Sequence, residues 1–365
     1  MAIAGGNITL DSTEGMDKIT QTEKVTSPYF SNGSATLAAA NIVTSSLTDT
    51  NETYFFGISN STTPTVEEFN VAFGSSNGYG GATGSAGRPS PTEAIYKQYA
   101  STLLAPTEVT GGFFISSPGS DSAVTSGKDT EIFVMSARRS NMKDRINKGT
   151  FSLIFSGSLS NGTTGKELHL TDDSVNKTPV ATPAGDRYNI VSGSAGVVSK
   201  QSTVKNYGFF YPDAGLLIFS AAELSASIPG KGTDVNDVVE FEDGTHTGFG
   251  TGTTADVNKK NAMRLINCLQ TAPAALTFRD EEDQVSAQYF CRVRSGQMNF
   301  SNNPTFVSGS LNELRQSTMK GNPTTFITSV QLYNSAGDMV AVGNLSTPLK
   351  KNFSSEATIK LKLTY

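Results

Sequence analysis

Two acidic clusters in this chain contain side chains that could carry out chemistry, because paired carboxylates can exchange protons with a substrate or hold a hard cation. The denser cluster covers residues 279–283 (Arg-Asp-Glu-Glu-Asp), and the second covers residues 240–243 (Glu-Phe-Glu-Asp). Neither has the D-x-[DN]-x-[DN]-G spacing of a calcium-binding loop. We therefore interpret both clusters as solvated turns. A calcium site is the alternative, since an irregular cage of oxygen ligands needs no linear motif.

The histidines and cysteines are the other side chains that could act as bases, nucleophiles or metal ligands. The two histidines, His169 and His246, have no obvious orienting partner in the sequence, which favours structural roles over catalytic ones. Cys268 and Cys291 are far from any CxxC spacing, and we interpret both as buried thiols. The alternative is a disulfide or a metal pair. Residues 1–6 lack both the charged segment and the apolar segment of a signal peptide, which implies synthesis in a reducing compartment.

Glycine-rich and aromatic segments could form a phosphate cradle or a stacking surface. Residues 78–83 and 248–253 both lack the third glycine of GxGxxG, so we interpret them as loops. The aromatic segments 207–212 and 113–114 are predicted to pack in a core rather than to stack on sugars or bases. HExxH, P-loop and paired CxxC motifs are absent from the sequence. We predict no catalytic, cofactor-binding or metal-binding residue and no cofactor.

Composition limits the classes of partner. The chain of 365 residues has a net charge of -5 and a pI near 5.2, which argues against an electrostatic grip on nucleic acid. No run approaches the roughly 18 apolar residues of a membrane-spanning helix, so no membrane partner is expected. Charged residues make up only 17% of the chain, below the usual quarter. This composition is typical of β-rich proteins whose polar surface lies against other subunits.

The elements that would position these residues are mostly strands. Many short apolar segments alternate with turns, and two helices are expected, near residues 91–104 and 256–270, the first with Ser90 as N-cap. We predict antiparallel β-sandwich or barrel-like domains with two or three inserted helices. The predicted strands before residue 300 are 53–59, 112–116, 131–137, 151–156, 167–170, 188–191, 207–211, 216–219 and 289–294.

Three regions are expected along the chain. Residues 1–51 contain few large apolar residues and are predicted to be an extended amino-terminal arm. Residues 52–205 would form one β-rich domain, and residues 206–365 a second one. The last 67 residues read as strand after strand, with a hairpin at 326–343 and a closing strand at 357–365.

The closing strand has a period of two. Ile359, Leu361 and Leu363 share one face, while Lys360 and Lys362 share the other. We expect the apolar face to lie against the fold and the lysine face to be exposed. The carboxyl end is therefore predicted to be tied into a sheet.

Three passages, at residues 207–219, 289–306 and 322–365, resemble the virion structural proteins of contractile-tailed, T-even-like bacteriophages, especially those that infect cyanobacteria. The resemblance implies an assembly protein rather than an enzyme, located in the virion after assembly in the host cytoplasm. It implies partners that are other tail proteins in multiple copies. No catalytic residues are carried over from such a family.

Within that class, a weaker similarity to a T-even baseplate wedge protein implies a place in the tail baseplate. It includes a Phe-rich strand at 53–56, a proline-containing loop at Thr63-Pro64, and an aromatic residue, Tyr365, at the end of the terminal strand. Alternatives are a neck, fibre-attachment or head-decoration protein. Further alternatives are a receptor-binding protein that places Tyr79 against a host-surface glycan, and a glycan-cleaving enzyme with two carboxylates about 5–10 Å apart.

Overall fold

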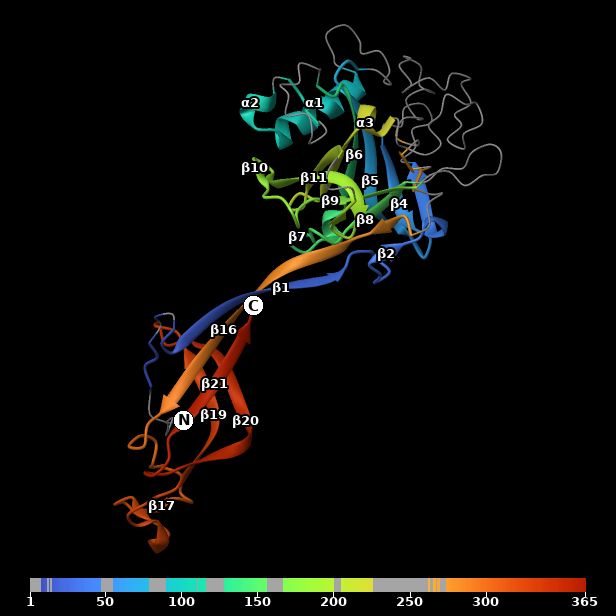
Figure 1. The fold of residues 1–365 in the computed structure, drawn as a ribbon. Helices are drawn as coiled ribbons and strands as arrows, with labels where there is room; N and C mark the ends of the chain where they lie inside the picture. The colour runs from blue at the N-terminus through green and yellow to red at the C-terminus, as the bar shows by residue number, and fades with distance from the viewer. Residues whose placement is uncertain are drawn as a thin grey trace. The chain divides into compact units, whose positions relative to one another are not determined.

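The structure is a computed structural model, and the part of the chain that it describes forms two compact units. We call residues 25–282 the barrel unit, and residues 1–24 together with 283–365 the terminal unit. Both consist mainly of antiparallel strands, as predicted (Figure 1). The described residues are 8–11, 13, 15–46, 55–78, 90–109, 111–115, 128–155, 167–199, 205–225, 262, 265–266, 268–269 and 274–365.

The barrel unit is built on one large sheet that nearly closes on itself. Its two edge strands, β2 (Thr36–Leu37) and β3 (Ile42–Ser46), are separated in the chain only by Ala38 and the short helix η1 (Ala39–Asn41), so the edges cannot lie more than about 18 Å apart. Two short strands, β10 (Val180–Thr182) and β12 (Val197–Val198), pair with β11 (Gly185–Ser194). The strand order is β2 (Thr36–Leu37), β15 (Leu276–Thr277), β8 (Ser152–Phe155), β9 (Leu168–Asp172), β11 (Gly185–Ser194), β13 (Asn206–Tyr211), β14 (Leu216–Ser220), β6 (Glu131–Ala137), β5 (Thr63–Ser75), β4 (Phe55–Asn60) and β3 (Ile42–Ser46).

Strand β6 shows how the barrel sheet is buried on both faces. Phe133 and Met135 belong to the large inner core, while Ile132 and Val134 belong to a second cluster on the other face. All four are fully buried. A nearly continuous apolar sequence such as Ile-Phe-Val-Met is therefore expected, since each alternate side chain has its own apolar partner layer.

Helical residues from the region predicted as a second helix fill part of the inner core. Ala262, Leu265, Ile266 and Leu269 are helical and fully buried, and they belong to the same cluster as the inner strand faces. Their spacing of three and four residues places them on one face of a helix. The expected helix at 256–270 is thus confirmed for its described residues.

Helix α1 (Pro91–Leu103) covers the outer face of the sheet. Ser90 is its N-cap and accepts a hydrogen bond from the backbone N–H of Glu93, as predicted, and Tyr96 and Leu103 pack in the outer cluster. Helix α2 (Pro106–Val109) follows directly. The remaining short elements of this unit are η2 (Arg139–Asn141), β7 (Arg145–Ile146) and α3 (Ala221–Ser225).

The terminal unit contains the carboxyl-terminal strands. Strands β1 (Lys18–Pro28), β16 (Arg279–Val293) and β21 (Ala357–Thr364) form one sheet, and only parts of β1 and β16 belong to the terminal unit. Strands β19 (Thr325–Tyr333) and β20 (Met339–Lys351) form a hairpin (Figure 1). A Cβ atom placed on Gly343 of β20 would lie 2.9 Å from Cδ1 of Leu361 of β21, so the hairpin packs against this sheet. The small elements are β17 (Val307–Ser308), β18 (Glu313–Leu314) and η3 (Ser317–Met319).

Strand β21 has the two faces predicted from its sequence. Ile359, Leu361 and Leu363 are partly buried, whereas Lys360 and Lys362 are exposed. The terminal residue continues the pairing, because Tyr365 exchanges backbone hydrogen bonds with Val285. The expectation that the carboxyl end is tied into a sheet is confirmed.

The division of the chain differs from the one expected from the sequence. A boundary at residue 205 would cut the barrel sheet, because β11 pairs with β13 across it. Residues 18–46 of the expected amino-terminal arm form β1, β2 and β3, which pair with strands of both sheets. The arm has few apolar residues, but Tyr29 and Phe30 are almost fully buried, and the ring of Tyr29 lies 5.0 Å from that of Phe69. Two aromatic anchors thus compensate for the polar composition.

The predicted strand at residues 112–116 does not form in its described part. The backbone N–H of Phe113 donates to the Tyr96 hydroxyl, and that of Ile115 donates to the Asp129 carboxylate. Side chains thus take the hydrogen bonds that a neighbouring strand would have supplied. Within the described ranges, the structure has no helix long and apolar enough to cross a membrane.

Candidate interaction surface

The acidic cluster at residues 279–283 lies in strand β16, and its interpretation as a solvated turn is wrong. Asp280 and Glu281 are buried. Glu281 accepts hydrogen bonds from Arg145 Nε at 2.8 Å and from Asn147 Nδ2 at 2.5 Å, and Asp280 accepts one from the Ser27 backbone N–H at 3.2 Å. These carboxylates connect strands β1, β7 and β16, so they have a structural role. No group of three or more metal-binding side chains converges among the described residues.

His169 and the two cysteines occupy ordinary structural positions. His169 is partly exposed, and its Nε2 lies 3.0 Å from the carboxylate of Glu167, a partner that was not predicted from the sequence. Cys268 and Cys291 are both buried thiols, as predicted. Burial raises the pKa of the Cys268 thiol to about 12. Cys268 is therefore protonated at neutral pH and a poor nucleophile.

The aromatic segment 207–211 packs in the core, as expected, and Phe113 is also buried. Phe114 is 42% exposed, so core packing is confirmed for only one residue of that pair. Several candidates lie outside the described residues: Tyr79, His246 and the segments 79–83, 240–243 and 248–253.

Exposed apolar side chains are concentrated in the terminal unit. Of the seventeen large apolar residues that are exposed in the described part of the chain, eleven belong to this unit, although it contains fewer than half of the residues. Examples are Phe300 at 50%, Leu311 at 82% and Phe353 at 51%. Exposed apolar residues that lie next to one another indicate a surface that contacts another molecule, whereas single exposed apolar residues are normal.

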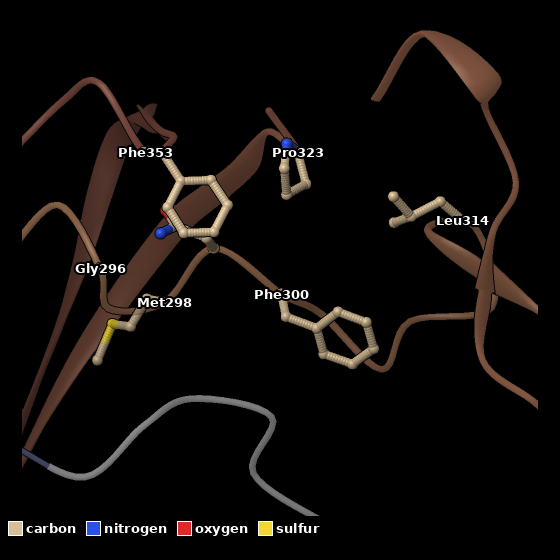
Figure 2. Close-up of a pocket in the computed structure, with 7 residues that line it drawn as sticks. Gly296, Met298, Phe300, Leu314, Pro323 and Phe353 are labelled. Atoms are coloured by element: carbon tan, nitrogen blue, oxygen red, sulfur yellow. The ribbon is translucent and has the colours of Figure 1, made fainter. Parts of the chain in front are cut away.

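At one end of the terminal unit, Phe300 and Phe353 border an open cleft of about 510 Å³ (Figure 2). Phe300 and Met298 follow strand β16, Pro323 precedes β19, and Phe353 follows β20. Figure 2 shows the rings of Phe353 and Pro323 near each other, with Leu314 of β18 across the cleft from them. The full lining is Gly296, Met298, Asn299, Phe300, Leu314, Pro323 and Phe353.

A buried lysine supports Asn299, one of the residues that line this cleft. Lys351 is fully buried, and its ammonium donates to the backbone oxygen of Ser295 at 3.0 Å, to Oδ1 of Asn299 at 2.9 Å and to the backbone oxygen of Asn352 at 2.9 Å. An ammonium has three N–H donors, so each one is matched with an acceptor. The segment after β16 and the end of β20 are therefore held together at the cleft.

A hydrogen bond and a ring contact also hold the loops that carry the aromatic residues of the cleft. The backbone N–H of Phe353 donates to Oδ1 of Asn322 at 3.2 Å, which connects the loops on either side of the hairpin. The ring of Phe300 meets that of Phe306 edge to face, with centroids 5.8 Å apart. Because these loops are tied at several points, the cleft is a formed surface that a partner could meet without large rearrangement.

The chemistry of the lining is almost entirely apolar. Its only polar side chain is that of Asn299, whose oxygen accepts from Lys351 and whose nitrogen donates to the Ser295 backbone oxygen at 2.6 Å. The amide is also buried, at 6% exposure, so it offers little access to a sugar hydroxyl. This lining suits apolar side chains of another polypeptide.

The cleft was not predicted from the sequence. Phe300 and Phe353 lie in segments rich in Asn and Ser, and large apolar residues in such loops are a signal that could have been used. The position of Leu314 and Pro323 across from them could not be inferred, since it depends on how the loops fold back. No protein-family profile matches the chain, and neither a curated protein nor a solved structure shows significant similarity to it.

Proposed function

We propose that this chain is a structural component of a bacteriophage virion, in the wedge of a contractile tail baseplate, and that it acts through contacts with other subunits. The resemblance of residues 207–219, 289–306 and 322–365 to such proteins supports the type of particle. The observation that supports a contact role is the concentration of exposed apolar side chains on the terminal unit.

The size of this apolar surface suits an interface centre. A half-exposed phenylalanine offers on the order of 100 Å² of apolar area, so Phe300 and Phe353 with the other residues that line the cleft approach the few hundred Å² that mark contact sites on soluble proteins. A stable interface buries about 800 Å² on each partner, with aromatic residues at its centre and a polar rim. The cleft and its surrounding Asn and Ser residues have that arrangement.

Subunit contact explains the lining of the cleft better than glycan binding does. A sugar site combines stacking rings with several side chains that hydrogen-bond to hydroxyl groups, and here the only polar side chain already bonds to protein groups. Several contacts of moderate strength also become persistent together, because the second contact of a tethered subunit forms at high effective concentration.

The test is assembly of particles that carry the variant Phe300→Ser with Phe353→Ser. We expect a loss of this chain from purified tails and fewer infectious particles, because the cleft loses two aromatic rings without disturbing a core. Val197→Ser, at a residue 72% exposed on the barrel unit, is the matched control and should assemble normally. The proposal is overturned if the wild-type chain is absent from purified particles, or if the double variant assembles like the control.

A further inference from the structure

We propose that strand β19 pairs, through the edge that does not face β20, with the same strand of a second copy of this chain, in antiparallel orientation. This inference names one partner for the contact role proposed above. It stands on the strand edges of the terminal unit and does not require that the particle be a phage tail.

The edge of β19 lacks the features by which proteins protect exposed strand edges. Such edges commonly carry lysine, proline or other charged residues, which prevent pairing with another chain. Strand β19, Thr-Phe-Ile-Thr-Ser-Val-Gln-Leu-Tyr, contains no charge and no proline, and it is rich in residues that favour strands. Among the described strands it pairs only with β20.

The other outer strands of the terminal unit are protected. Strand β20 carries Pro348 and Lys350, and β21 carries Lys360 and Lys362 on its exposed face. Strand β1 carries lysine and glutamate along its length. The contrast within one unit indicates that β19 is the strand left open to pairing.

The two faces of β19 are defined by its pairing with β20. Ile327 is paired with Leu349, and Leu332 with Ala341; both β19 residues are partly buried. Phe326 and Tyr333 are exposed, at 59% and 45%. A partner strand must therefore place its partly buried residues opposite the partly buried residues of β19, and its exposed residues opposite the exposed ones.

Strand β19 itself meets this requirement. In an antiparallel pair of two copies, Phe326 can lie opposite Tyr333, and Ile327 opposite Leu332, so that exposed residues face exposed ones and partly buried residues face partly buried ones. Thr328 then lies opposite Gln331. Only Ser329 and Val330, which lie opposite each other twice at the centre, join residues of different faces, next to an irregularity in the pairing of β19 with β20 between Ile327 and Ser329.

Pairing would also complete a small sheet. The hairpin packs against the sheet that contains β21, but its own sheet has only two strands among the described residues. Two copies joined through β19 form a continuous four-stranded sheet. A contact through β21 would instead bring lysine side chains of the two copies close together, which is unfavourable.

Sedimentation velocity of the purified full chain over a range of concentrations tests this. We expect a species of twice the 38.5 kDa mass of one chain. The variant Thr328→Lys with Gln331→Lys places like charges opposite each other twice across the interface, and should weaken association about tenfold or more. Thr328→Lys with Gln331→Glu places opposite charges there and should restore it.

The control places the same charges on the neighbouring strand. Asn344→Lys with Ser346→Lys, at two exposed positions of β20, should leave association unchanged. Circular dichroism spectra that match the wild type would show that each variant is folded. The inference is overturned if the wild-type chain remains a monomer, or if the double-lysine variant of β19 associates as the wild type does. A monomeric chain that is still found in tails would end this inference alone, whereas a dimer absent from particles would end the proposed function alone.

Discussion

The ammonium of Lys351 lies 2.9 Å from the side-chain oxygen of Asn299, both residues are buried, and Asn299 lines the apolar cleft. The two residues are 52 positions apart in the chain. Their contact joins the loop after β16 to the end of the hairpin, and it thereby fixes where Phe300 and Phe353 are presented.

Replacing this lysine should destabilise the terminal unit. Lys351→Met removes three hydrogen bonds and leaves the side-chain oxygen of the buried Asn299 without this donor, so we expect a loss of about 2 kcal/mol. Lys350→Met, at the exposed neighbouring position, is the matched control and should cost little. Thermal unfolding followed by calorimetry measures both. Equal melting temperatures for the two variants would refute the role given to the buried ammonium.

The carboxylate of Glu281 should stabilise the barrel unit. Glu281→Ala leaves the partly buried Arg145 and the buried Asn147 without this acceptor, and breaking such a pair costs about 3 kcal/mol. Glu282→Ala, next along the strand, removes an ion pair to Lys143, whose side chain is 46% exposed, and should cost less than about 1 kcal/mol. Urea denaturation of both variants checks the difference. A larger loss in the control would contradict the assignment.

The two thiols should differ in reactivity in the folded protein. Burial raises the pKa of Cys268 to about 12, so on the order of one molecule in 10⁴ carries the thiolate at pH 8. Raising the pH towards 12 should increase its alkylation rate in proportion to the thiolate. Mass spectrometry after iodoacetamide treatment should find Cys291 modified first, with the two rates equal in denaturant. Early modification of Cys268 would contradict its burial among the inner core residues.

The N-cap of α1 should contribute measurably to stability. Ser90→Ala removes the acceptor for the Glu93 backbone N–H and should cost about 1 kcal/mol, while Ser90→Asp should retain most of it. Chemical denaturation of the three proteins compares them. If alanine is tolerated as well as aspartate, the cap is not important for this helix.

Much of the fold could be predicted because its signals are local. Strand β6 was expected at residues 131–137 and lies there, and the alternation of Ile359, Leu361 and Leu363 gave the correct buried face of β21. The N-cap of α1 was equally clear, since Ser90 precedes Pro91 and a helical pattern. In each case, neighbouring residues determine the structure.

The features that could not be predicted depend on contacts between distant segments. Asp280 and Glu281 have the composition of a solvated turn, and their burial follows from Ser27, Arg145 and Asn147, which are far away in the sequence. The inclusion of residues 18–46 in the sheets depends on Tyr29 and Phe30 reaching the inner core. The cleft likewise needs three loops to fold back toward one another, which no local pattern specifies.

The central claim is that the apolar end of the terminal unit contacts another subunit in an assembled particle. Reconstruction of intact particles by electron cryomicroscopy measures this most directly, because it locates the chain and its neighbours together. We expect this chain in the tail baseplate, with Phe300 and Phe353 covered by another polypeptide. A reconstruction with those side chains open to solvent, or with the chain absent from the particle, would contradict the claim.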